Sequence, residues 1–71
     1  MMRNNNASVK VLKKHENIMT GIRVELNQKM TMNGKIIHAV VITDMDTGKH
    51  KKIYVHNTIG YAFKRYKAAI A

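Results

Sequence analysis

The dipeptide Asn33-Gly34 lies between two segments of alternating residues, and this arrangement constrains the fold more than any other feature of the chain. In residues 21–32 the apolar side chains fall on even positions and the odd positions from 23 onward are polar, a period of two that predicts a half-buried strand. Asn-Gly is a strong hairpin signal, because a type I′ turn needs positive φ at both central residues. We therefore expect residues 35–43 to return as the second strand of an antiparallel hairpin.

A two-residue loop at this dipeptide would fix the register of the hairpin. Leu26 would then lie opposite Val41, which joins the apolar face of the first strand to the odd-numbered residues of the second. The predicted core face of the hairpin consists of Val24, Leu26, Met30, Ile37, Ala39 and Val41.

A third strand and a helix are predicted after this hairpin. The second strand is apolar on both faces, which favours a central position in a sheet, and residues 50–56 supply its second neighbour. A three-residue loop ending in a left-handed Gly48 would place Ile53 and Val55 on the core face. Beyond a cap at Asn57 or Thr58, apolar residues recur at helical spacing, and we expect three basic residues to face away from the core: Lys64, Arg65 and Lys67.

The N-terminal segment leaves two alternatives open. We expect residues 1–7 to form a flexible arm. Ser8 is suited to cap a short helix in residues 8–19, whereas the alternation of Val9 and Val11 favours an edge strand. The predicted fold is a single α+β domain, in which residues 20–71 form an antiparallel three-stranded sheet with one C-terminal helix packed on one face. Residues 1–19 are a basic arm or a short additional element.

The charge of the chain is strongly unbalanced. Thirteen Lys and Arg residues face four acidic residues, which gives a formal net charge of +9 over 71 residues. Such a fold is expected to bind a polyanion, either nucleic acid or an acidic protein. No apolar run is long enough to span a bilayer, the N-terminal residues lack the apolar region of a secretory signal, and Cys is absent. We therefore expect a cytoplasmic protein without membrane contact.

The sheet face opposite the helix is the predicted binding surface. Basic and hydrogen-bonding side chains there flank a mildly apolar centre, which suits a β-sheet that reads the major groove of duplex DNA while lysines contact phosphates. The residues expected to bind nucleic acid, DNA rather than RNA, are Arg23, Lys29, His38, Lys52, Tyr54, Lys64, Arg65 and Lys67.

The apolar centre of the same face is an alternative protein interface, made of Ile36, Val40 and Ile42. Residues 9–19 or a second copy of the chain would cover it, because an uncovered patch on so small a domain favours aggregation. Alternatively, the chain is a modulator that docks on an acidic host protein. A third alternative is an RNA- or ribosome-associated protein.

Three stretches carry a resemblance to known DNA-binding domains: Thr20-Gly21-Ile22-Arg23, Gly34-Lys35-Ile36-Ile37-His38-Ala39-Val40-Val41 and Tyr61-Ala62-Phe63-Lys64-Arg65-Tyr66-Lys67-Ala68-Ala69. Three antiparallel strands followed by such a helix are similar to plant ethylene-response-factor (Apetala-type) domains and to the amino-terminal arm-binding domains of tyrosine integrases. The resemblance implies a sheet face that binds the major groove through Arg23, Lys29, His38, Lys52 and Tyr54. The middle strand here lacks the aromatic residue of those families. The size and the Lys, Asn, Ile and Met usage resemble small bacteriophage accessory proteins.

Catalytic and metal sites are not predicted. Asp44-x-Asp46-x-Gly48 begins like a calcium loop but lacks the later ligands, so a hairpin turn with Asx hydrogen bonds is the better interpretation. His50 and His56 lie about 20 Å apart along one strand, and His38 with His56 would lack a third ligand. No nucleophile with a base and no carboxylate pair is evident. We therefore expect a protein that is not an enzyme and that uses no cofactor or metal.

Overall fold

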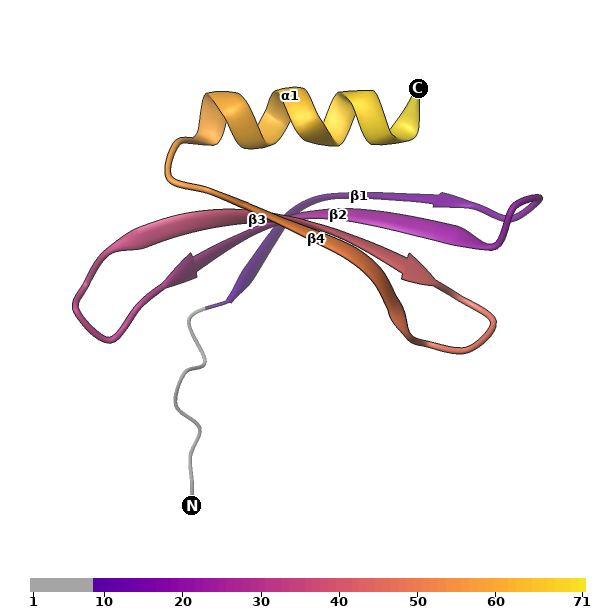
Figure 1. The fold of residues 1–71 in the computed structure, drawn as a ribbon, viewed down its shortest axis with the longest axis horizontal. Helices are drawn as coiled ribbons and strands as arrows, with labels where there is room; N and C mark the ends of the chain where they lie inside the picture. Colours follow the sequence, from indigo (N-terminus) through magenta and orange to yellow (C-terminus); the bar gives the residue numbers. More distant parts are fainter. Residues whose placement is uncertain (1–8) are drawn as a thin grey trace, which may run out of the picture.

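The computed structural model describes residues 9–71, which form four antiparallel strands followed by one helix (Figure 1). The elements are β1 (Lys10–Asn17), β2 (Ile22–Met30), β3 (Ile36–Asp44), β4 (His50–His56) and α1 (Ile59–Ile70). The strands neighbour one another in the order β1-β2-β3-β4, and α1 lies across one face of the sheet. The predicted α+β class with a C-terminal helix is confirmed, but the sheet has four strands and not three.

The additional strand comes from the segment for which a helix and an edge strand were the alternatives. β1 pairs with β2 from Lys10 opposite Gln28 to Asn17 opposite Ile22, and Leu12 forms a bulge without a partner. All eight residues of β1 are exposed, because α1 packs chiefly against β2, β3 and β4. The edge-strand interpretation is therefore correct. The predicted arm over residues 1–7 and the predicted cap at Ser8 lie outside the described residues.

The β2–β3 turn contains one residue more than the sequence predicted. The Thr31 amide donates to the Lys35 carbonyl at 2.7 Å, and the Gly34 amide donates to the Thr31 carbonyl at 2.9 Å, so the loop is residues 32–34. Gly34 has a φ of 81°, whereas Asn33 does not have a positive φ. A type I′ turn would need both residues in that region, so the chain instead forms the three-residue loop in which a left-handed glycine closes the turn.

This additional loop residue reverses the faces of β3. Leu26 lies opposite Val40, and Val24 lies opposite Ile42, so the even-numbered residues of β3 face the helix. A register shift of one residue moves every side chain of a strand to the other face. The prediction that Ile37, Ala39 and Val41 share the core face of Val24 and Leu26 is therefore wrong.

The register between β3 and β4 agrees with the prediction, although the turn is built differently. Val41 lies opposite Ile53, and Ala39 lies opposite Val55. The loop has four residues, 45–48, and ends in a left-handed Gly48 with a φ of 76°. A bulge in β4 then shifts the pairing by one residue. The residues of β4 beyond the bulge therefore lie opposite the same β3 residues as the predicted three-residue loop would place them. Ile53 and Val55 consequently accompany Val41 on the face opposite α1.

The core lies between α1 and the helix-facing side chains of β2 and β3. Its buried residues are Val24, Leu26, Val40, Ala62 and Tyr66, and the partly buried residues around them are Ile22, Ile42, Tyr54, Phe63, Ala69 and Ile70. The apolar stripe predicted for the helix is confirmed except at Ile59, which is 47% exposed. In the part of the chain that the structure describes, no helix has the length and apolar character needed to cross a membrane.

Candidate nucleic-acid interface

The observed register divides the predicted binding residues between the two faces of the sheet. Arg23 and Lys29 lie on the face opposite α1, as predicted. His38, Lys52 and Tyr54 instead lie on the helix-facing side, because Lys52 and Tyr54 pair with Ile42 and Val40. The sheet-face site predicted from the sequence is therefore not assembled on one surface.

The predicted protein interface also lies on the helix-facing side. Val40 has no exposed surface and belongs to the core, and Ile42 packs against that core. Ile42 is half-buried, and Ile36, the first residue of β3, has 44% of its surface exposed. The patch lies on the side of the sheet that carries α1, so the prediction that it lies on the open sheet face is wrong.

Arg23 is balanced by two glutamates on the face opposite α1. Its Nη1 lies 3.8 Å from Glu16 Oε2, and its Nε lies 3.7 Å from Glu25 Oε2. These distances join opposite charges but are too long for hydrogen bonds, and the buried Nε has no hydrogen-bond partner. Within residues 9–71 these are the only ion pairs, so Arg23 is the basic residue least free to contact a phosphate.

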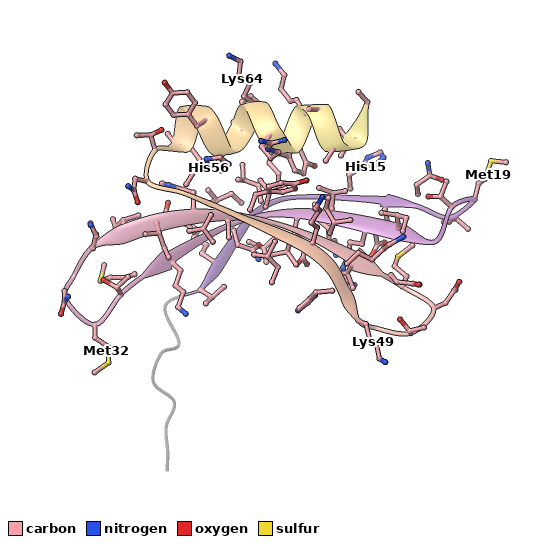
Figure 2. All side chains as sticks on the ribbon, in the orientation of Figure 1. His15, Met19, Met32, Lys49, His56 and Lys64 are labelled. Carbon is pink, nitrogen blue, oxygen red and sulfur yellow. The ribbon has the colours of Figure 1, made fainter. Side chains whose placement is uncertain are left out.

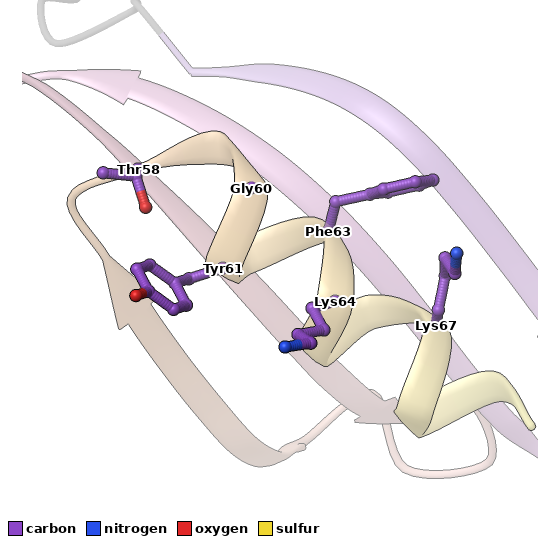
Figure 3. A pocket seen from close by; sticks show the side chains of 6 residues that line it. All are labelled: Thr58, Gly60, Tyr61, Phe63, Lys64 and Lys67. Atoms are coloured by element: carbon purple, nitrogen blue, oxygen red, sulfur yellow. The ribbon is translucent and has the colours of Figure 1, made fainter.

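Two lysines and Phe63 form a cluster between α1 and β1. Lys13 Nζ of β1 lies 5.7 Å from the Phe63 ring centroid, and Lys67 Nζ of α1 lies 5.1 Å from it. Figure 3 shows Phe63 and Lys67 on one side of the helix, with Tyr61 and Lys64 directed toward the other. A cation within about 6 Å of an aromatic centroid is attracted by the negative face of the ring. The Phe63 ring therefore attracts a cation from α1 and a cation from β1.

Tyr54 has an equivalent position on the other flank of the helix. Arg65 Cζ of α1 lies 4.3 Å from the Tyr54 ring centroid, and Lys52 Nζ of β4 lies 5.7 Å from it. Lys64 points away from the sheet at the outer surface of α1, as Figure 2 shows. We call the five residues Lys13, Lys52, Lys64, Arg65 and Lys67 the helix-side basic surface.

Two cavities show that this surface is grooved along the helix. A cavity of about 440 Å³ lies at the start of α1 and is lined by Thr58, Gly60, Tyr61, Phe63, Lys64 and Lys67 (Figure 3). A second cavity of about 260 Å³ is lined by His56, Tyr61, Lys64, Arg65 and Ala68. Basic side chains line both cavities, and no carboxylate does.

The acidic residues of the described chain lie elsewhere. Glu16 and Glu25 are on the face opposite α1, beside Arg23. Asp44 is the last residue of β3, opposite Ile22, and Asp46 belongs to the β3–β4 loop. Asp44 Oδ1 accepts the amide hydrogen of Asp46 at 2.9 Å, as the Asx-turn interpretation predicted. None of the five cations of the helix-side basic surface takes part in an ion pair among residues 9–71.

His38 and His56 lie directly opposite each other on β3 and β4. His38 is 8% exposed, and both His38 Nδ1 and His56 Nε2 are buried without a hydrogen-bond partner. Among the described residues, no group of three or more His, Cys, Asp or Glu side chains could hold a metal ion. His38 is therefore too enclosed to contact nucleic acid directly.

Sequence reasoning named Lys13 as a possible phosphate contact but missed its position beside Phe63. Lys13 belongs to the segment whose structure stayed ambiguous, and Phe63 was assigned to the core by its helical spacing. The one available signal was the four-residue spacing of Phe63 and Lys67, which places both side chains on one flank of a helix.

Comparison with known proteins finds no matching family model, no similar curated protein and no similar solved structure. The resemblance to ethylene-response-factor and integrase arm-binding domains therefore stays a prediction. The candidate interface is defined by its geometry and charge alone.

Proposed function

We propose that this protein is a small, non-enzymatic nucleic-acid-binding protein that uses the helix-side basic surface. The observation that supports the proposal is the segregation of charge. Five unpaired cations gather around and on α1, whereas both glutamates lie on the opposite face and the two described aspartates lie at the end of β3 and in the loop after it. A surface of one sign attracts a polyanion, and a phosphate backbone is the ligand that presents closely spaced negative charges in a line.

The proposed mode of binding follows from the side chains available. Four of the five cations are lysines, which contact phosphates as point charges and carry little base specificity. The 12-residue helix is about 18 Å long, which corresponds to about five steps along one strand of a duplex. We therefore propose duplex DNA as the ligand, bound through its backbone with little sequence preference.

The salt dependence of binding tests this proposal. Each neutralised phosphate contributes about −0.9 to the slope of log K against log salt for duplex DNA, so five contacts predict a slope between about −4 and −5. The double variant Lys64→Ala with Lys67→Ala should bind more weakly, and its slope should be shallower by about two. Fluorescence anisotropy with a labelled duplex at several salt concentrations measures both quantities.

A control variant of equal charge makes the test specific to the surface. Lys14→Ala with Lys29→Ala also removes two positive charges, but from the face opposite α1. Its affinity and slope should stay close to those of the wild type. An equal loss in both double variants, or binding that does not change with salt, would contradict the proposed surface.

Competition experiments separate the alternative ligands. An RNA of the same sequence that displaces the duplex at lower concentration would favour an RNA-associated protein. Strong binding to an acidic protein with no measurable binding to either nucleic acid would favour a host-protein modulator.

A further inference from the structure

The sheet face opposite α1 has an apolar half. Cross-strand pairs of β3 and β4 place five aliphatic residues side by side on this face: Ile37, Ala39, Val41, Ile53 and Val55, which we call the open-face patch. Ile53 and Val55 are 53% and 58% exposed, Ile37 and Ala39 are half-buried, and Val41 is buried with 8% of its surface exposed. No element among residues 9–71 covers the patch. The exposed part of the patch is therefore on β4, and an exposed apolar surface of this kind on a small domain marks an interaction site.

The other half of this face carries charges of both signs. On β1 and β2, Lys14 lies opposite Glu25, and Glu16 lies opposite Arg23. The helix side, in contrast, carries the five cations of the helix-side basic surface, and the acid that the register places on that side is Asp44 at the end of β3. A second copy of a chain with a net charge of +9 is therefore repelled most at the helix side and least at this face.

We propose that the open-face patch is the interface of a symmetric homodimer in which two sheets pack face to face. A two-fold interface needs one patch that is complementary to itself, and aliphatic side chains meet this requirement. Face-to-face sheets pack about 10 Å apart, which buries the half-exposed Ile53 and Val55 of both copies. The mixed charges of β1 and β2 form the polar rim that such interfaces have.

The available area is sufficient for a dimer of moderate affinity. Four strands of seven to nine residues at a spacing of about 4.8 Å give the whole face, the open-face patch together with its polar rim, a footprint of about 500 Å² per copy. The total of about 1,000 Å² is near the lower limit for specific interfaces. The dimer should therefore dissociate within the concentration range that solution methods cover.

Sedimentation equilibrium from micromolar to millimolar protein tests the proposal. The average mass should rise from 8.1 kDa toward twice that value with increasing concentration. Ile53→Thr should weaken the dimer by about tenfold, because each dimer loses two buried isoleucines. The matched control is Ile36→Thr, which makes the same change at a strand residue of similar exposure on the helix-facing side and should leave the dissociation constant unchanged.

Two further measurements distinguish this interface from the proposed DNA site. Added salt screens the repulsion between two positive chains and should tighten the dimer, whereas it should weaken DNA binding. A mixture of isotope-labelled and unlabelled wild-type protein should show intermolecular contacts at the methyl groups of Ile53 and Val55. A protein that stays monomeric at high concentration and high salt overturns the proposal, and so does a dimer without those contacts.

Discussion

Leu26 and Met30 differ in burial although they belong to the same alternating pattern. Both are even-numbered residues of β2, and the sequence places both on the core face. Leu26 is 2% exposed beneath α1, whereas Met30 is 48% exposed at the end of the strand. The alternation gives the face of a residue, but the position of the helix along the strand decides whether that face is covered. The core is consequently smaller than the apolar pattern suggests.

We expect Leu26→Ala to lower the free energy of unfolding by about 3 kcal/mol, because it leaves a cavity in the centre of the core. Met30→Ala should lower it by less than about 1 kcal/mol, because that side chain is already half in water. Chemical denaturation monitored by circular dichroism measures both values. Equal losses in the two variants would show that Met30 is covered in solution.

The elements themselves were largely predictable, whereas the faces of the strands were not. The period of two, the helical spacing after Thr58 and the glycine turns located β2, β3, β4 and α1. The face of β3 could not be predicted, because its even-numbered and odd-numbered residues are both aliphatic. The register then depended on the turn alone, and Asn33-Gly34 is compatible with a loop of two residues or of three.

The edge strand was difficult to predict for a different reason. β1 buries none of its side chains, so the sequence carries no apolar pattern strong enough to identify it. The strand is held chiefly by its ladder of hydrogen bonds to β2. For the same reason the position of Lys13 next to Phe63 could not be derived from the sequence.

We expect the rates of amide hydrogen exchange to differ among the strands, because the strands differ in how many side chains they bury. The amides of β1 should exchange fastest, because the strand opens without exposing a core, and those of β3 should be the most protected. Native-state exchange followed by nuclear magnetic resonance measures the order. Protection in β1 equal to that in β3 would mean that another surface covers the edge strand.

The whole molecule separates its charges across the sheet. The five cations of the helix-side basic surface lie on and around α1, while both glutamates lie on the other face. From the sequence it was possible to predict the excess of charge and the basic helix. It was not possible to predict that Lys52 and Tyr54 would join the helix, because that placement follows from the β2–β3 register.

We expect the melting temperature of the free protein to rise with salt, because like charges on the helix side repel one another in the folded state. The double variant Lys64→Ala with Lys67→Ala should melt at a higher temperature than the wild type and should respond less to salt. Thermal melts followed by circular dichroism provide the measurement. A melting temperature that falls as salt is added would show that attraction dominates instead.

The three-residue loop between β2 and β3 also bears on how this chain can evolve. Surface loops usually tolerate insertions and deletions, because their length seldom affects the packing of the elements that they connect. Here the deletion of one loop residue would exchange the two faces of β3 and β4 relative to β2. Both faces of β3 are aliphatic, so the chain could still enclose a core, now with Ile37 and Val41 beneath the helix. The deletion of a single codon would then place beneath the helix the face of β3 and β4 that is now open to a partner.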